Sequence, residues 1–277
     1  MEYITLNNDV KMPLLGFGTF QLTGQQCATA VSDAIQAGDR LIDTAEAYGN
    51  EEAVGQGIKM SGLDRRDLFL ATKVNFTSYD DARATVLASM RKLNTDYLDL
   101  VLLHWPFGNY YRAWHELEKL YQEKRIRAIG VSNFEPDRLV DLIAYNQVVP
   151  AVNQIETNVY CQQGAARKWM AKYGVQPMAY APLGQGRRNH MFTEPTIVSL
   201  AEKYGKTPAQ VLLRYLTQRQ VIVIPRSTQP KHIQENIAIF DFTMTDAELQ
   251  AIAALDQRQP LIGNPEDPHL VEAAQNW

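Results

Sequence analysis

Four polar residues have the side-chain types that would deliver a proton to a carbonyl oxygen: Asp43, Tyr48, Lys73 and His104. When a hydride reaches a carbonyl carbon, negative charge develops on the oxygen, and a positioned acid must supply a proton. A phenol, whose reference pKa is about 10, becomes a stronger acid beside an ammonium group. We therefore expect Lys73 to lower the pKa of Tyr48. Asp43 would keep Lys73 protonated, and His104 would orient the substrate oxygen or share the proton transfer.

Taken singly, each of these residues has an ordinary structural interpretation. Asp43 suits a turn or a helix cap, with Lys73 as its ion-pair partner. His104 suits a hydrogen-bonded histidine, and Tyr48 suits a packed aromatic residue. The catalytic interpretation therefore depends on the elements that would bring the four side chains to one pocket.

Eight short apolar runs alternate with longer amphipathic segments along the chain. Their starts lie about 24 to 30 residues apart, the length of one strand-and-helix unit, until a wider gap before the last run. Glu194–Lys203 supplies an extra helical segment in that gap. This even spacing predicts the α/β class and a closed (β/α)8 TIM barrel. The expected strands are Leu14–Phe17, Leu41–Thr44, Leu68–Val74, Leu98–Leu103, Ile126–Val131, Pro150–Ile155, Gln176–Tyr180 and Val221–Ile224.

The segments between and before these strands also carry recognisable patterns. Asp81–Leu93, Arg112–Glu123 and Pro208–Thr217 have apolar residues at helical spacing, as helices packed on a sheet require. Before the first barrel strand, Tyr3–Leu6 and Val10–Met12 flank a turn-forming Asn-Asn-Asp sequence, which predicts a small β-hairpin.

A doubly wound sheet is the main alternative for a chain of this class, and it would present Gly-x-Gly-x-x-Gly after an early strand. Gly16-Phe17-Gly18 begins in that way, but Gln21 stands at the third glycine position, so the fingerprint fails. No Gly/Ser linker or change of composition divides the chain. We therefore expect residues 1–277 to form a single barrel domain.

In a barrel of this type the active site lies at the carboxyl ends of the strands. Polar residues collect there, at or just after the ends of successive strands. They are Asp43, Lys73, His104, Ser132, Asn133, Gln154 and Tyr180.

Composition excludes several other classes of function. The formal net charge of -4 gives no basic surface for nucleic acid or for an anionic membrane. Cys27 and Cys161 are too few and too far apart for a disulfide framework or a metal-ligand motif, so we expect no metal. The N-terminus lacks a basic region followed by an apolar run, and the apolar stretch Tyr97–Phe107 is too short to span a membrane. These features favour a cytoplasmic protein, as a monomer or weak homo-oligomer.

Six short strings, taken in order along nearly the whole chain, resemble the aldo-keto reductase superfamily. The resemblance is to the bacterial branch that includes 2,5-diketogluconate and methylglyoxal reductases. Each string falls at a different strand end, so the set is more specific than any single motif. The strings are Asp43-Thr44-Ala45-Glu46-Ala47-Tyr48-Gly49-Asn50-Glu51, Lys73, His104-Trp105-Pro106, Gly130-Val131-Ser132-Asn133-Phe134, Asn153-Gln154-Ile155-Glu156 and Ile224-Pro225-Arg226-Ser227.

The resemblance implies an oxidoreductase that reduces aldehydes or ketones with NADPH, by hydride transfer from the nicotinamide. It implies a catalytic tetrad of Asp43, Tyr48, Lys73 and His104, and a substrate pocket formed by Phe20, Tyr48, His104 and Trp105. Ser132, Asn133 and Gln154 would hold the nicotinamide carboxamide, and Tyr180 would stack on the ring. The remaining implied cofactor contacts are Gly18, Thr19, Asp43, Pro182, Leu183, Arg226, Ser227, Thr228, His232, Glu235 and Asn236.

The segment from Arg226 to Asn236 bears on the choice between NADPH and NADH. Arg226-Ser227-Thr228 precedes a helix start, where positive charge and free N–H groups suit a phosphate. Many relatives that prefer NADPH have arginine where this chain has His232, and a largely neutral imidazole binds a 2′-phosphate less strongly. We expect NADPH to be favoured and NADH to be used as well.

A turn, two loop segments and several aromatic residues give further expectations. Lys124 stands where relatives often have a glycine in the left-handed conformation at a helix end. The segment Gly184–Met191 is expected to be a loop, and the tail from Pro260 to Trp277 is expected to fold over the barrel mouth. Phe107, Tyr110 and Tyr111 are additional aromatic candidates for the pocket wall, some of which will be ordinary packing residues.

Two other functions remain open at this point. A Schiff-base aldolase on the same barrel would use Lys73 as its nucleophile, although a nearby Asp43 would keep that amine charged. A dinucleotide-binding regulatory protein with a vestigial site would bind the cofactor without turning it over.

Overall fold

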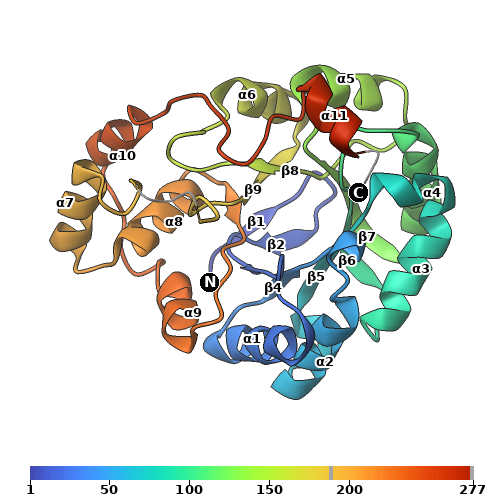
Figure 1. Cartoon of the computed structure of the whole chain (residues 1–277), viewed down its shortest axis with the longest axis horizontal. Helices are drawn as coiled ribbons and strands as arrows, with labels where there is room; N and C mark the ends of the chain where they lie inside the picture. Colours follow the sequence, from blue (N-terminus) through green and yellow to red (C-terminus); the bar gives the residue numbers. More distant parts are fainter. Residues whose placement is uncertain (187–189, 275–277) are drawn as a thin grey trace.

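Eight parallel strands form one central sheet in residues 1–186 and 190–274, which the computed structural model describes. The strands lie in the middle of the molecule, and helices surround them (Figure 1). They run in the sheet in the order β10-β9-β8-β7-β6-β5-β4-β3. Their bounds are β3 Phe17–Gly18, β4 Leu41–Asp43, β5 Phe69–Val74, β6 Leu98–Leu103, β7 Ile126–Ser132, β8 Val152–Glu156, β9 Gln176–Tyr180 and β10 Ile222–Val223.

The two ends of this sheet meet, which closes it into a barrel. Leu15 forms a parallel bridge with Val223, and the Gly16 N–H donates to the Val223 carbonyl over 2.9 Å. Close to the mouth, the Gly18 N–H donates to the Pro225 carbonyl over 3.0 Å. The (β/α)8 barrel expected from the sequence is therefore confirmed, although the first and last strands are shorter than expected.

The helices cover the outside of the barrel and follow the expected pattern. The extra segment before the last strand is the helix α7, and α8 begins with a capping box between Thr207 and Gln210. The α-helices are α1 Gly24–Ala37, α2 Glu51–Ser61, α3 Ala82–Lys92, α4 Tyr110–Gln122, α5 Pro136–Ala144, α6 Gly164–Tyr173, α7 Pro195–Tyr204, α8 Pro208–Gln218, α9 Pro230–Ile237, α10 Asp246–Ala253 and α11 Pro268–Ala274. Short 3-10 helices are η1 Glu46–Tyr48, η2 Arg65–Asp67 and η3 Phe76–Asp81.

The N-terminal hairpin closes the end of the barrel opposite the site. Strands β1 (Tyr3–Thr5) and β2 (Lys11–Pro13) pair antiparallel, as expected. Leu6 and Met12 from this hairpin belong to the same buried cluster as inward-facing strand residues such as Leu41 and Leu100. The hairpin therefore helps to fill the base of the barrel with apolar side chains.

Alternation along each strand explains why chemistry gathers at the other end. Side chains two residues apart point to the same face of a strand. The interior cluster includes Leu41, Ala71, Leu102, Val152 and Met178. Two positions farther toward the carboxyl end stand Asp43, Lys73, His104, Gln154 and Tyr180. Each of these strands thus changes from an apolar to a polar inward side chain as it reaches the mouth.

The structure describes the turn at Lys124 and most of the tail after Pro260, and both bear on expectations from the sequence. Lys124 adopts the left-handed conformation with φ of 60° at the turn between α4 and β7, so the helix ends there without glycine. The carboxylate of Glu156 accepts hydrogen bonds from the Leu261 and Ile262 N–H groups at 2.7 and 2.9 Å, which fastens the tail to the mouth end of β8. Within the loop expected at 184–191, residues 187–189 lie outside the described residues.

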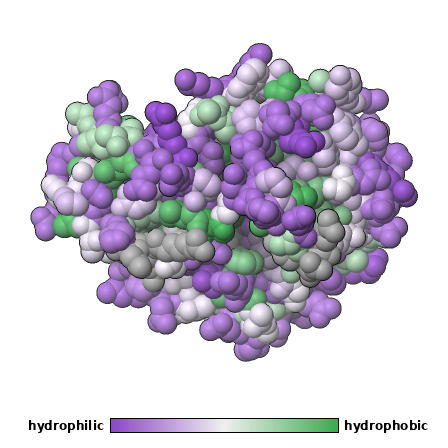
Figure 2. Space-filling model, turned by 45° about the horizontal axis from the view of Figure 1, so that its top comes forward, coloured by the Kyte–Doolittle hydropathy of each residue, from purple (hydrophilic) through white to green (hydrophobic). Residues whose placement is uncertain are grey.

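Polar side chains dominate the face of the molecule that Figure 2 shows. The face in Figure 2 is mostly hydrophilic, and its hydrophobic residues form small separate patches. No helix in the described part of the chain has the length and apolar character needed to cross a membrane.

Candidate active site

A buried ion pair between Lys73 and Asp43 lies at the centre of the barrel mouth. Lys73 Nζ is 2.6 Å from Asp43 Oδ2, and the two side chains are 0% and 2% exposed. The ammonium also donates to the Thr44 carbonyl over 2.7 Å. Burial alone would lower the pKa of Lys73, but Asp43 and Tyr48 outweigh it and raise that pKa. The amine therefore stays protonated at neutral pH.

The hydroxyl of Tyr48 lies beside this ion pair. Lys73 Nζ donates to Tyr48 Oη over 3.4 Å, and Nζ lies 5.0 Å from the centre of the Tyr48 ring. Tyr48 ends the short helix η1, which Glu46 fastens to the neighbouring loop by accepting from the Asn75 N–H and the Ser78 hydroxyl. The phenol and the ammonium thus meet as the sequence predicts.

The net pKa shift of Tyr48 differs from the expectation. Burial raises the pKa of Tyr48 above its ordinary value, Lys73 acts against this rise, and Asp43 adds to it. The sum is a raised pKa, because a phenolate loses more by leaving water than it gains from an ammonium already paired with a carboxylate. Tyr48 is consequently protonated at neutral pH, and Lys73 limits how far its acidity falls.

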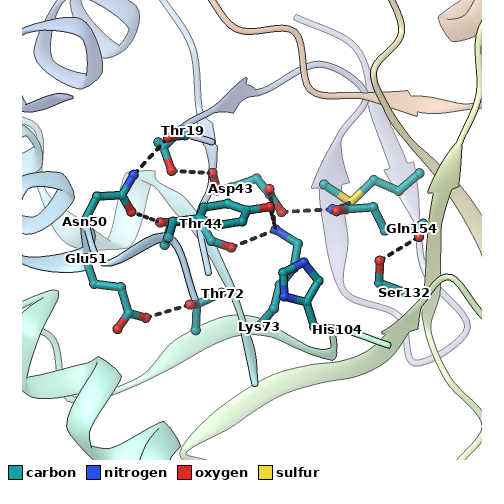
Figure 3. A network of polar contacts seen from close by, with 12 residues as sticks. Thr19, Asp43, Thr44, Asn50, Glu51, Thr72, Lys73, His104, Ser132 and Gln154 are labelled. Carbon is teal, nitrogen blue, oxygen red and sulfur yellow. Dashed lines mark hydrogen bonds and ion pairs between the residues drawn. The ribbon is translucent and has the colours of Figure 1, made fainter. Parts of the chain in front are cut away.

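His104 completes the group from the end of β6. Its ring centre lies 5.7 Å from that of Tyr48, and its Nδ1 is a buried atom without a hydrogen-bond partner in the described chain. Burial, aided by the charge of Lys73, lowers the pKa of His104 to about 3. The imidazole is therefore neutral near pH 7, which suits a hydrogen-bonding role better than a proton-storing one. Figure 3 shows His104 near Lys73.

A second polar group stands on the neighbouring strands. Ser132 Oγ donates to the Gln154 carbonyl over 2.8 Å, and Asn133 Nδ2 donates to the His104 carbonyl over 3.1 Å. The Tyr180 hydroxyl donates to Asn133 Oδ1 over 2.9 Å, and Asn133 has a left-handed backbone with φ of 61°. The structure brings together the residues expected to hold a carboxamide and the aromatic ring expected beside them.

Gln154 links this second group to the ion pair. Its amide nitrogen donates to Asp43 Oδ1 over 2.9 Å, while Lys73 occupies Oδ2 (Figure 3). Thr19 contributes from the other side, because its N–H and hydroxyl both donate to the Asp43 carbonyl. At Gly18 an added Cβ would lie 2.9 Å from the Ile224 carbonyl oxygen, so this position has room only for glycine.

The remaining expected cofactor residues stand after β9, before α9 and on α9. Pro182 and Leu183 follow β9, with Pro182 buried and Leu183 half-buried. Arg226, Thr228 and His232 are exposed around the start of α9, and Ser227 Oγ accepts from the Gln229 N–H. On α9, Glu235 is half-buried and Asn236 is buried. Within the described residues, this group makes no hydrogen bond to the tetrad.

Aromatic side chains border the tetrad. The ring of Phe20 is 41% exposed, and its centre lies 5.0 Å from that of Tyr48. Trp105 stacks on Phe107 at 5.3 Å, while Tyr110 is buried against Phe134. The Trp105 ring also stacks on His104 with ring centres 6.1 Å apart, so Phe20 and Trp105 lie beside the site, whereas Tyr110 belongs to the packing outside it.

The sequence did not single out Glu156. This residue is 2% exposed and lines a cavity of about 560 Å³ together with Asn133, Tyr180, Lys168 and Glu266. The tail that Glu156 fastens forms one wall of this cavity. The sequence held one indication of this position. Glu156 stands two residues after Gln154, and residues two apart on a strand point to the same face, here the inner face of β8.

Comparison with known proteins gives the family. Residues 14–257 match the model of the aldo/keto reductase family. The chain is 41% identical to morphine 6-dehydrogenase of Pseudomonas putida, covering 95% of this chain and 94% of the relative. It is 39% identical to methylglyoxal reductase DkgA of Escherichia coli K12, covering 95% and 96%. The protein belongs to the aldo/keto reductase family.

Solved structures agree with this assignment. An aldo-keto reductase from a Medee basin deep-sea metagenome library superposes with a TM-score of 0.92 at 35% identity, covering 95% of this chain and 98% of the other. An aldo-keto reductase of Bombyx mori in complex with NADP superposes with a TM-score of 0.89 at 33% identity, covering 95% of both chains. The expected family and barrel fold are therefore confirmed.

The lowered pKa of His104 makes a prediction for stability. Between pH of about 6.5 and about 3 the unfolded chain binds a proton at His104 that the folded chain does not, so the free energy of unfolding falls as pH falls through this range. His104→Asn removes this linkage. Urea unfolding between pH 4 and pH 8 should show a shallower loss of stability for the variant than for wild type. The exposed His115→Asn serves as control. Equal slopes for wild type and His104→Asn would contradict the prediction.

Proposed function

We propose that the protein reduces aldehydes and ketones to alcohols with a nicotinamide dinucleotide, and that Tyr48 donates the proton. It would belong to the oxidoreductases that act on CH–OH groups, working in the direction of carbonyl reduction. One observation carries this proposal: the Tyr48 hydroxyl lies 3.4 Å from an ammonium that a buried carboxylate keeps charged. The membership of the chain in the aldo/keto reductase family supports it. The shared sheet of eight strands also supports one barrel domain over residues 1–277.

The residues of the second group fit a nicotinamide carboxamide. A primary amide needs both donors and acceptors, and Ser132, Asn133 and Gln154 supply a hydroxyl and two amides at adjacent strand ends. The backbone carbonyl of Gln154 accepts from Ser132, whereas its side-chain oxygen Oε1 accepts no hydrogen bond within the described residues and is available as an acceptor. Gly18 allows the Ile224 carbonyl to approach its backbone closely, and Arg226 offers an exposed guanidinium four residues before α9 for phosphate. Relatives of similar fold are solved with NADP and NADPH, so we propose NADPH as the favoured cofactor, with NADH used as well.

When bound, the reduced dinucleotide supplies a hydride to the carbonyl carbon. The protein's own residues then act on the carbonyl oxygen. Tyr48 gives its proton to the developing alkoxide, a stronger base than phenolate, and Lys73 stabilises the phenolate that remains. His104, being neutral, orients the oxygen by hydrogen bonding rather than supplying the proton. Asp43 keeps Lys73 charged and in place.

We propose small carbonyl compounds, α-diketones and keto sugars as the substrate range. Phe20 and Trp105 provide apolar surface beside the polar groups, as a small carbonyl pocket requires. A relative of similar length is a methylglyoxal reductase, which fits this range.

The aldolase alternative is disfavoured by the state of Lys73. A Schiff-base nucleophile must lose its proton near neutral pH, whereas the pKa of Lys73 is raised by Asp43 and Tyr48. The regulatory alternative is not favoured by any feature of the site, because each member of the tetrad is in place.

A spectroscopic assay tests the function, with Tyr48→Phe as the decisive variant. Loss of the near-ultraviolet absorbance of NADPH or NADH is followed with aldehydes, α-diketones and keto sugars. We expect wild type to oxidise NADPH with several of these compounds. Tyr48→Phe should bind NADPH normally, since the ring still packs, and lose about 10²- to 10⁴-fold in kcat.

Three outcomes would redirect this proposal. Tight NADPH binding by wild type without turnover of any compound would favour the regulatory protein. Near-normal turnover by Tyr48→Phe would remove Tyr48 from its role while leaving the reductase activity intact. Trapping of a substrate adduct on Lys73 by borohydride would revive the aldolase.

The choice of cofactor is tested at His232. His232→Arg adds a charged donor beside Arg226 and Ser227, and a charge-assisted hydrogen bond to a 2′-phosphate contributes about 1.5–3 kcal/mol. The ratio of kcat/KM for NADPH to that for NADH should rise on the order of ten- to a hundredfold. Gln234→Arg adds the same charge two residues away, on the other side of α9, and should leave the ratio nearly unchanged. An equal response of the two variants, or no response of His232→Arg, would count against a phosphate site at this position.

A further inference from the structure

The side chain of Asn50 is used in an unusual way for its position. Asn50 is the N-cap residue of α2, where an asparagine ordinarily accepts a hydrogen bond from the first turn of the helix. Here the side chain makes no cap hydrogen bond, and the residue is only 2% exposed. It turns back from the helix toward the barrel mouth, so its amide serves something other than the helix start.

The amide of Asn50 makes three hydrogen bonds to two loops of the mouth. Its Oδ1 accepts from the Thr44 hydroxyl over 2.8 Å. Its Nδ2 donates to the Thr19 carbonyl over 2.8 Å and to the Leu22 carbonyl over 2.9 Å. Both N–H groups and the carbonyl are therefore occupied, and Figure 3 shows Asn50 between Thr19 and Thr44.

Two of the three partners of Asn50, Thr44 and Thr19, are hydrogen-bonded to the residues of the ion pair. The Thr44 carbonyl accepts from Lys73 Nζ over 2.7 Å. The Thr19 N–H and hydroxyl donate to the Asp43 carbonyl at 3.0 and 3.1 Å. One side-chain amide thus joins the backbone next to Asp43 with the backbone that holds Lys73.

Asn50 also belongs to the loop that carries Tyr48. Only Gly49, which has a left-handed backbone with φ of 63°, stands between the two residues. The other loop, held through Thr19 and Leu22, carries Phe20, whose ring centre lies 5.0 Å from that of Tyr48. A shift of Asn50 would therefore move the phenol relative to the ammonium and also change its aromatic neighbour.

We infer that Asn50 is a positioning residue that sets the distance between the Tyr48 hydroxyl and Lys73 Nζ. The inference rests on the proposed function, because it concerns the proton that Tyr48 donates. Asn50 does not touch the reacting atoms and acts through Thr44, Thr19 and its own loop. Misplacement of a catalytic group by about 1 Å can cost on the order of 10²-fold in rate, so a modest loosening of this loop should be visible in turnover.

The test uses Asn50→Asp and a matched pair at Thr44 in the full-length protein. Asn50→Asp keeps the oxygen that accepts from Thr44 but replaces the donating amide nitrogen with a carboxylate oxygen. That oxygen repels the carbonyl oxygens of Thr19 and Leu22, so the two loops are pushed apart. Thr44→Val removes only the hydroxyl that bonds Asn50, and Thr44→Ser restores it. For Asn50→Asp we expect kcat to fall about 10- to 100-fold, and for Thr44→Val we expect a smaller fall that Thr44→Ser reverses.

Two readouts separate positioning from a general loss of stability. The solvent deuterium isotope effect on kcat should increase in Asn50→Asp and Thr44→Val, because proton transfer from a misplaced phenol becomes more rate-limiting. The pH profile of kcat should shift upward on its alkaline side, because the pKa of Tyr48 rises when Lys73 is farther away. A purely structural role would change neither readout.

Glu118→Ala provides the matched control. Glu118 is 6% exposed on α4, and its carboxylate accepts from the Gln147 and Val148 N–H groups, away from the tetrad. This variant should lose stability in urea while keeping the wild-type kcat, isotope effect and pH profile.

The possible failures are distinguishable. Absence of carbonyl reduction by wild type would overturn the proposed function itself. An active wild type with an unchanged kcat and isotope effect in Asn50→Asp would overturn only the positioning role. If Asn50→Asp does not fold, the Thr44 pair decides: an isotope effect in Thr44→Val equal to that of wild type overturns the inference, and an increase that Thr44→Ser reverses supports it.

Discussion

The site depends on one buried electrostatic interaction, the ion pair of Lys73 and Asp43 at 2.6 Å. Removing two charges from water is costly, and the structure offsets that cost with further hydrogen bonds to each partner. Lys73 also bonds the Thr44 carbonyl, and Asp43 also accepts from Gln154. The pair is hydrogen-bonded to the phenol of Tyr48 and to the amide of Gln154, whose neighbours are the hydroxyl of Ser132 and the amide of Asn133.

The barrel makes such a pair possible because it places an apolar base directly below a polar mouth. Inward side chains on each strand are apolar as far as Leu41, Ala71 and Met178, and the N-terminal hairpin fills the space beneath them. The next inward positions carry the ion pair and the ring of Tyr180. Water cannot reach the ion pair from below, and the strands hold it more rigidly than loops would. Tyr48 meets the ion pair from the loop after β4, where it ends the short helix η1 with its hydroxyl 3.4 Å from the ammonium.

Much of this arrangement could be predicted from the sequence, for identifiable reasons. Strand spacing predicted the barrel because each βα unit has a nearly fixed length, and the polar residues at strand ends predicted the mouth because parallel strands share one polarity. The net pKa shift of Tyr48 was not predictable, since it depends on how deeply the ring is buried. The roles of Asn50 and Glu156 were hidden as well. Asn50 stands at an ordinary helix-cap position, and two of the partners of Glu156 are backbone groups more than a hundred residues away.

The central claim is that the Lys73 ammonium makes proton transfer from Tyr48 possible. It is tested most directly by the kcat of Lys73→Met for carbonyl reduction, measured beside the dissociation constant for NADPH. We expect a loss of about 10²-fold or more in kcat with cofactor binding largely retained, because a buried phenolate without its counter-charge is strongly disfavoured. A variant that binds NADPH and reduces carbonyl compounds at the wild-type rate would contradict it.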